Sequence, residues 1–214
     1  MKIWMNGAFV VALAAALGGI QSQAQVDLAL SGFRTITSSS TGAGTTQTPT
    51  DSEGGLLQLR RIVNPLVGYE FNFSIAGANE TYTAPSTSTP PNCYPIGPSG
   101  TPPSCPPLEV SGKAFQFGVN WIVSMSSKSV RPFALGGIGL RVTSPGSSPY
   151  SVNTVARPAF VYGGGLDWSA GKHLGVRLQI QGNMTKAPNL SDIFNSTAKY
   201  TQIYEPMGGV FYRF

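Results

Sequence analysis

Apolar and polar residues alternate along most of the chain with the period of two that is typical of β-strands. The clearest example is 66–82, where Val67, Tyr69, Phe71, Phe73 and Ile75 share one face and mostly small or polar residues share the other. The same pattern predicts eight strands, at residues 26–37, 56–63, 66–82, 108–125, 130–144, 157–169, 173–185 and 198–214. In 130–144 the apolar residues change face at Gly136-Gly137, so we expect a β-bulge or kink there.

The connections between these strands alternate between long and short. Long polar loops are expected at about 38–55, 83–107, 145–156 and 186–197, and short turns at 64–65, 126–129 and 171–172. More than half of the prolines lie in Thr83–Pro107, which excludes a strand in that segment. Long outward loops, short turns and an even strand number are the features of bacterial outer-membrane barrels. Both ends of the mature chain then lie on the side of the short turns.

The strand pattern distinguishes a membrane barrel from a soluble one. The more aromatic face of the strands is nearly continuous, and the other face holds Gln, Asn, Gly, Arg and acidic residues. A soluble secreted lipocalin-like barrel has its apolar face inside, around a ligand. If this chain were such a barrel, its broad aromatic face would line an internal cavity, and little else in the sequence would fill that cavity. We therefore predict an all-β fold: an eight-stranded antiparallel up-and-down transmembrane β-barrel.

The C-terminal strand carries a further signal. Val210, Tyr212 and Phe214 share one apolar face, and the chain ends on an aromatic residue. With the alternating strands YGGGLDWSAGKHLGVRLQI, this ending VFYRF resembles the family of small outer-membrane barrels related to OmpX and to the transmembrane part of OmpA. The resemblance implies that the barrel-assembly machinery recognises these three residues as an assembly signal. It also implies a monomer in outer-membrane lipid.

The N-terminus predicts export. Lys2, the apolar run Ala8–Ile20 and the small residues of Ser22-Gln23-Ala24 form a secretory signal peptide, 1–24, that is cleaved to leave the barrel domain, 25–214. We expect the outer membrane of a Gram-negative-type bacterium as the location. Charged residues are scarce, and the formal net charge of +5 favours contact with anionic lipopolysaccharide; a role in solubility before insertion is the alternative. Nothing points to a nucleic-acid partner.

The chain offers little for catalysis. Cys93 and Cys105 form a close pair in an exported chain, which predicts a disulfide rather than a metal or redox site. The single histidine, His173, follows a short turn at the expected periplasmic end, and no nucleophile and acid converge on it. We expect no enzyme activity, no cofactor and no metal.

Strand parity places six charges inside the barrel: Arg60, Glu70, Asp167, Arg177, Glu205 and Arg213. Arg60 and Glu70 lie symmetrically about Pro65, and Asp167 and Arg177 lie symmetrically about Lys172, so each pair is expected to form a lumenal ion pair. The pairs either gate a narrow pore or fill a lumen only wide enough for side chains, and we favour the second. The outer face supplies candidates for an aromatic girdle at the membrane interfaces: Tyr69, Trp121, Tyr162, Trp168, Tyr204 and Tyr212.

These features specify architecture better than activity. We expect a structural or surface-interaction role through the extracellular loops, with Thr83–Pro107 as the segment most suited to a surface ligand. A narrow pore for ions or small solutes is one alternative. A soluble secreted lipocalin-like binding barrel is the other.

Overall fold

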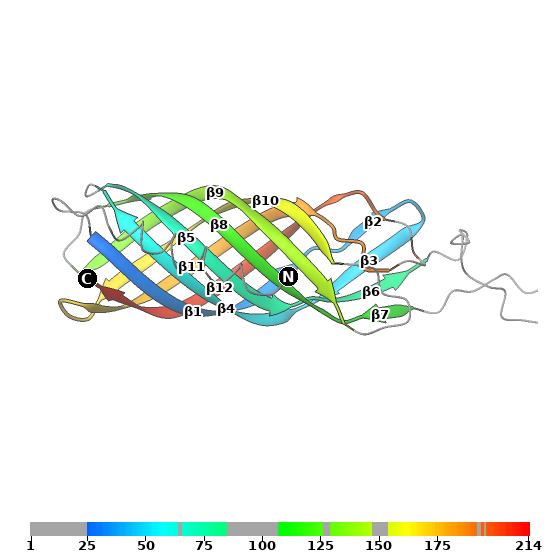
Figure 1. The fold of residues 1–214 in the computed structure, drawn as a ribbon, viewed down its shortest axis with the longest axis horizontal. Helices are drawn as coiled ribbons and strands as arrows, with labels where there is room; N and C mark the ends of the chain where they lie inside the picture. Colours follow the sequence, from blue (N-terminus) through cyan, green and yellow to red (C-terminus); the bar gives the residue numbers. More distant parts are fainter. Residues whose placement is uncertain are drawn as a thin grey trace, which may run out of the picture.

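The structure is a computed structural model, and it describes residues 25–63, 66–84, 107–125, 129–146, 154–191, 194 and 196–214. These residues form a closed barrel and a smaller sheet that stands beyond one end of it (Figure 1). Among the described residues, no helix is long and apolar enough to cross a membrane.

The barrel has eight antiparallel strands, and this confirms the expected fold class. Around the barrel the order is β1-β12-β11-β10-β9-β8-β5-β4, so the first and last strands pair and close the sheet. The strands are β1 Gln25–Thr37, β4 Ser52–Ile62, β5 Val67–Gly77, β8 Gly112–Ser124, β9 Val130–Pro145, β10 Val155–Ser169, β11 Leu174–Lys186 and β12 Tyr200–Arg213. A strand needs about 9–11 residues to cross a membrane, and all eight reach that length.

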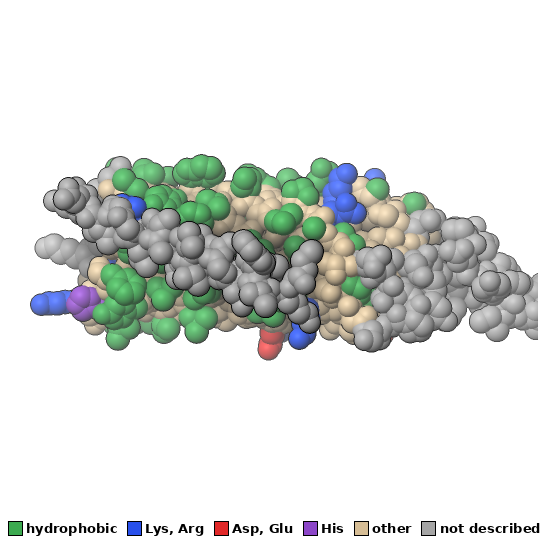
Figure 2. All heavy atoms as spheres, in the orientation of Figure 1, with side chains coloured by type: hydrophobic (Ala, Val, Ile, Leu, Met, Phe, Trp, Pro, Cys, Tyr) green, Lys and Arg blue, Asp and Glu red, His purple; other side chains and the backbone are tan. Residues whose placement is uncertain are grey.

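The strands alternate between a lipid-like exterior and a polar interior. On β11, Leu178 and Ile180 are 57 % and 61 % exposed, while Arg177 and Gln179 are buried. This burial of polar rather than apolar side chains is the reverse of a soluble barrel. Hydrophobic side chains cover much of the described barrel surface, while the surface toward the smaller sheet is mostly polar (Figure 2).

The smaller sheet, which we call the outer sheet, has the order β2-β3-β6-β7. Its strands are β2 Ser40–Gly42, β3 Thr45–Thr50, β6 Asn79–Thr83 and β7 Leu108–Val110. The segment 38–55, expected as a loop, therefore contains two strands and the start of β4. The expected strands 66–82 and 108–125 are each interrupted. At Ala78 the chain passes from the barrel into the outer sheet, and at Ser111 it returns from the outer sheet to the barrel. The backbone N–H of Ala78 donates to Gly112 O at 2.9 Å across this junction.

A two-residue turn joins β2 to β3. Gly42 pairs with Thr45, and the two residues between them, Ala43 and Gly44, have positive φ values of 49° and 72°. Positive φ at both positions is the geometry of the type I′ turn, whose twist matches that of a β-hairpin. The alanine is the strained member of the turn because its Cβ disfavours this conformation.

The expected bulge at Gly136-Gly137 is wrong. The pairing of β9 with β8 and with β10 runs without a break through both glycines. The apolar residues before the glycines change face because Phe133 and Leu135 point into the lumen and are each 6 % exposed. The strand is regular, and its first half contributes apolar groups to the barrel interior.

The two ends of the barrel differ. Short connections follow β4, β8 and β10, and Gln25 and Phe214 lie at the same end as these connections. Phe214 N–H donates to Val26 O at 3.0 Å, which ties the last residue to the first strand. The outer sheet and the C-terminal ends of β9 and β11 lie at the opposite end, which is the outward end in a bacterial barrel (Figure 1).

Candidate functional site

Four buried charges meet in the lumen. Arg60 Nη2 lies 2.8 Å from Glu70 Oε2, and Arg177 Nε lies 2.7 Å from Asp167 Oδ1. Two further contacts join these pairs, Arg60 Nη1 to Asp167 Oδ2 at 2.9 Å and Arg177 Nη1 to Glu70 Oε2 at 3.8 Å. All four side chains are at most 1 % exposed, so they form one desolvated cluster.

Strand register creates the two short pairs. Arg60 is directly opposite Glu70 in β4 and β5, and Asp167 is directly opposite Arg177 in β10 and β11. The contact between Arg60 and Asp167 has a different origin, because β4 and β10 lie on opposite sides of the barrel. This contact crosses the lumen, so the two side chains together span the interior.

Aromatic rings lie close to the arginines of the lumen. The Arg60 guanidinium lies over the Phe133 ring, 4.1 Å from its centroid, and Arg177 lies 5.7 Å from the same ring. Toward the end of the barrel with the short connections, Phe211 is 5.4 Å from Arg177 and 5.3 Å from Arg213. The cationic planes therefore have ring faces as well as carboxylates for partners, and both attract a guanidinium.

Polar and apolar layers fill the rest of the lumen. Gln58 Nε2 donates to Gln179 Oε1 at 3.1 Å, and Gln116 Nε2 donates to Asn183 Oδ1 at 2.8 Å. Two groups of buried apolar side chains lie among these layers: Phe33, Leu56, Ala76 and Met207 in one, and Ile122, Phe133, Leu135 and Val161 in the other. The interior is a packed core of mixed polarity.

The other inward charges predicted from the sequence have partners that we did not predict. Glu205 Oε1 lies 3.6 Å from Arg141 Nη1, and Arg213 Nε lies 3.2 Å from Asp27 Oδ1. Asp27 and Arg141 each lie between two apolar residues that belong to the outer, lipid-facing side of the strand. The alternation of the sequence therefore already indicated that both side chains point into the barrel. Together with the four-charge cluster, these two further ion pairs contain equal numbers of basic and acidic side chains.

The girdle candidates lie at different depths. Four of them are near the end of the barrel that has the short connections: Tyr69, Trp121, Trp168 and Tyr212. Tyr204 is near the outward end of β12, whereas Tyr162 is in the middle of β10. The Tyr162 ring packs over Gly182, where an added Cβ would lie 2.4 Å from the ring. Gly182 in turn pairs with Tyr204, so Tyr162 and Tyr204 are neighbours on the outer surface of the barrel.

The proposed assembly signal lies on the outside of β12. Val210, Tyr212 and Phe214 are 59 %, 43 % and 69 % exposed, and the rings of Tyr212 and Phe214 meet edge to face at 5.0 Å. His173 stacks on Tyr212 with the ring centroids 5.7 Å apart, and its Nδ1 lies 2.9 Å from Arg213 O. The histidine is an exposed residue of the rim that has the short connections.

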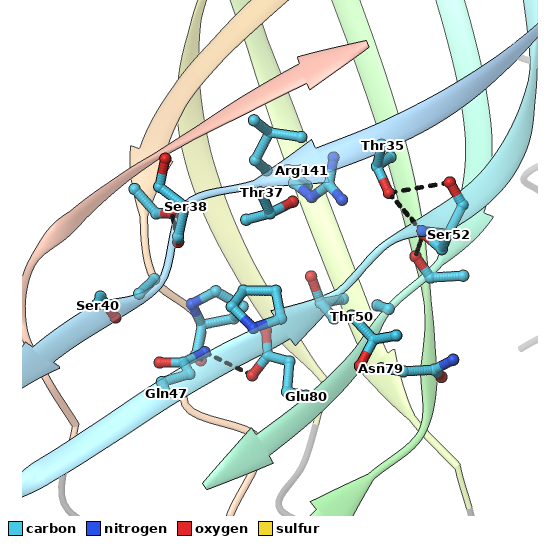
Figure 3. Close-up of a pocket in the computed structure, with 18 residues that line it drawn as sticks. Thr35, Thr37, Ser38, Ser40, Gln47, Thr50, Ser52, Asn79, Glu80 and Arg141 are labelled. Atoms are coloured by element: carbon cyan, nitrogen blue, oxygen red, sulfur yellow. Dashed lines mark hydrogen bonds between the residues drawn. The ribbon is translucent and has the colours of Figure 1, made fainter.

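A polar hollow lies at the outward mouth, between the barrel rim and the outer sheet (Figure 3). It has an empty volume of about 480 Å³, part of which is open to solvent. Arg141 and Thr35 lie on the barrel side of the hollow, and Gln47 and Glu80 lie on the side of the outer sheet (Figure 3). Half of the remaining lining residues are serine or threonine.

Glu80 is the buried acid of the outer sheet. Its Oε2 accepts hydrogen bonds from Tyr82 Oη and Gln47 Nε2, both at 2.5 Å. Gln47 Nε2 also donates to Pro188 O at 2.7 Å, and Leu190 N–H donates to Tyr82 Oη at 2.8 Å. Burial raises the pKa of Glu80 to about 7, against the opposing effects of the two hydrogen bonds and of Arg141. Burial beside Glu80 also raises the pKa of Tyr82.

Two predicted features have no structural outcome here. Cys93, Cys105 and nearly all of the proline-rich segment lie outside the described residues, as does the signal peptide 1–24. Within the described residues, His, Cys, Asp and Glu side chains form no group of three or more that would suit a metal ion.

Comparison with known proteins gives a fold relationship without a close relative in sequence. No protein-family model matches the chain, and no curated protein matches it. Neisserial surface protein A matches 90 % of this chain over 100 % of its own, with a TM-score of 0.55 at 13 % identity. OprG from Pseudomonas aeruginosa matches 92 % over 98 % of its own, with a TM-score of 0.54 at 12 % identity. Ail, the attachment invasion locus protein of Yersinia pestis, matches 90 % over 100 %, with a TM-score of 0.50 at 14 % identity.

These similarities agree with the closed eight-stranded sheet, its apolar exterior and its polar interior. The chain therefore has the fold of the small eight-stranded outer-membrane β-barrels, the class that its sequence resembles.

Proposed function

We propose that this protein is a bacterial outer-membrane barrel that acts as a closed anchor and presents its outer sheet for contact with other molecules at the cell surface. The observation that carries the proposal is the outer sheet itself. It is built from the connections between barrel strands, and closing the barrel does not require it.

The outer sheet has a small apolar core of its own. Tyr82 and Val110 pack with Leu190 and Phe194, and the rings of Tyr82 and Phe194 stack at 5.8 Å. A short sheet in water needs such packing to hold one conformation. Its presence supports a surface of defined shape rather than a set of free loops.

The filled lumen supports an anchor over a pore. The contact between Arg60 and Asp167 crosses the interior, and the apolar cluster of Phe33, Leu56 and Met207 lies between it and the outer sheet. A conducting path would have to break buried ion pairs and pass this apolar layer. No described feature favours a channel instead.

Three partners belong to this proposal. The exposed apolar belt would contact outer-membrane lipid, and the net positive charge would favour lipopolysaccharide. The barrel-assembly machinery would read Val210, Tyr212 and Phe214, which are accessible on the outside of the closing strand. We also propose that the chain works as a monomer after its signal peptide is cleaved.

Two measurements test the anchor and the surface role separately. Refolded protein in a planar lipid bilayer should give no discrete current steps once insertion is verified, and reproducible steps would contradict a closed anchor. Bacteria that produce the protein should adhere to serum-coated polystyrene more than bacteria without it.

Adhesion should disappear when residues 38–51 are replaced by an Asn-Gly turn, because this removes β2 and β3. The matched control is the same replacement of Ala170–His173 at the opposite end. Each variant must still show the faster gel migration of an unheated barrel. Equal adhesion of all three proteins would refute the surface role.

A further inference from the structure

Several contacts hold the outer sheet against the connection between β11 and β12, and one group of polar contacts is centred on Glu80. Gln47 and Glu80 belong to its two central strands, and Gln47 bridges Glu80 to Pro188 in the connection between β11 and β12. Tyr82 joins the same connection by accepting a hydrogen bond from Leu190 N–H. The Glu80 side chain is thus enclosed between the sheet and the segment it rests on, with the residue 6 % exposed.

The hydrogen-bond partners of Glu80 are neutral. Tyr82 and Gln47 are its two hydrogen-bond donors in the described structure, and neither carries a charge near neutral pH. Arg141 of β9 is the cation that faces it across the hollow, and Arg141 already lies 3.6 Å from Glu205 of β12. The remaining hollow-lining side chains of β1, β4 and β12 are hydroxyl-bearing or apolar.

We propose that the outer sheet is a pH-sensitive cap on the barrel mouth, held closed while the Glu80 carboxyl is protonated and loosened when that carboxyl releases its proton to water. An ionised carboxylate at this position lacks solvent and has no cation in hydrogen-bonding contact, so the closed arrangement disfavours it. Lifting the sheet restores water to the carboxylate and widens the opening of the polar hollow.

The direction of the effect follows from the raised pKa of Glu80. The pKa rises from 4.5 to about 7 in the closed sheet, so the closed state binds a proton that the opened state releases between these values. The cap is therefore most stable below pH 4.5 and loses stability as the pH rises to about 7. The opening equilibrium constant should rise about tenfold per pH unit, or about 300-fold over the whole window.

Hydrogen–deuterium exchange of the full mature protein in lipid vesicles measures this opening. Exchange rates at pH 5 to 8 are divided by the intrinsic amide rates, so that only the opening equilibrium remains. Amides of β3 and β6 should lose protection as the pH rises, while amides of the barrel strands β5 and β8 in the same molecules should not.

Variants assign the effect to one carboxyl. Glu80→Gln keeps the shape and an acceptor oxygen but cannot ionise, so β3 and β6 should be protected equally at every pH. Glu109→Gln, at an exposed position on β7 of the same sheet, should keep the wild-type pH dependence. If Glu80→Gln does not assemble, the carbon-13 carboxyl shift of Glu80 in the wild type must titrate over the same pH range as the loss of protection.

Three results would refute the proposal of a pH-sensitive cap. They are a flat pH profile in the wild type, a profile that survives in Glu80→Gln, and a Glu80 titration that does not coincide with the opening. A carboxyl with only a structural role would lower protection by the same factor at every pH when it is replaced.

Discussion

Reversing the charge at Glu70 adds a third guanidinium to the centre of the barrel. In the wild type, Glu70 accepts from Arg60 at 2.8 Å and lies 3.8 Å from Arg177. Glu70→Arg removes the carboxylate that both arginines share and replaces it with a like charge. The swap Arg60→Glu with Glu70→Arg restores that hairpin pair, and a simple two-residue account predicts full recovery of stability.

The cluster geometry predicts a smaller recovery. Breaking a buried ion pair by removing one partner costs about 3–5 kcal/mol. Glu70→Arg breaks contacts with two arginines, so we expect a loss of at least about 5 kcal/mol, which is comparable to the total stability of many domains. In the double swap, the new carboxylate on β4 would face Asp167 in place of the 2.9 Å contact, and the new guanidinium on β5 would face Arg177. At most about half of the loss should return.

Reversing all four charges provides the decisive comparison. Adding Asp167→Arg and Arg177→Asp to the double swap opposes every charge to an opposite one again. The quadruple variant should be more stable than the double variant, although it differs from the wild type at more positions. Ordinary independent substitutions would give the reverse order.

Urea unfolding in lipid vesicles measures this series. Trp121 and Trp168 are 63 % and 57 % exposed on the outer face, so their fluorescence reports removal from lipid. Loss of the fast-migrating unheated band on a gel provides a second readout. Full recovery in the double swap, or a quadruple variant weaker than the double, would show that the two hairpin pairs act independently and would refute the four-charge cluster.

Three further predictions concern single positions. Gly175→Ala places a Cβ 2.2 Å from the Phe211 ring, and urea unfolding should show a loss of about 1–3 kcal/mol that Phe211→Leu partly reverses; an unchanged midpoint would contradict this packing. Ala43→Asn suits the positive φ of 49° and should increase amide protection in β2 and β3 by an amount equivalent to about 0.5–1 kcal/mol, whereas decreased protection would contradict the strained turn. Phe214→Ser should lower the amount of barrel assembled in cells but leave refolding in detergent unchanged, and equal amounts in cells would argue against an assembly signal.

Local pattern was enough to predict the eight barrel strands and the facing residues of a hairpin. Arg60 and Glu70 are equally far from the short turn between their strands, and the turn sets the register of the hairpin, so the pair can be predicted from the sequence. The contact from Arg60 to Asp167 cannot be predicted in this way. It depends on the closure and tilt of the whole sheet, which no short stretch of sequence specifies.

The outer sheet was missed for a different reason. The buried positions of β3 are polar, Thr45 and Gln47, so its two faces do not differ in hydropathy. Phe133 and Leu135 show the opposite difficulty, since hydropathy alone does not distinguish an apolar residue that faces lipid from one that is buried in the lumen. In both cases the tertiary partner decides the environment, and the sequence near the residue does not name that partner.

The contact between Arg60 and Asp167 has a consequence for how the barrel forms. The two residues come from strands on opposite walls and are far apart in the chain, so they meet only after the sheet has curled and β1 has reached β12. Before that moment, each charge on an open sheet faces water or lipid without its partner across the lumen. The pairing therefore makes closure more cooperative, because a sheet that stops short of closure keeps its two hairpin ion pairs but lacks the buried contact that joins them.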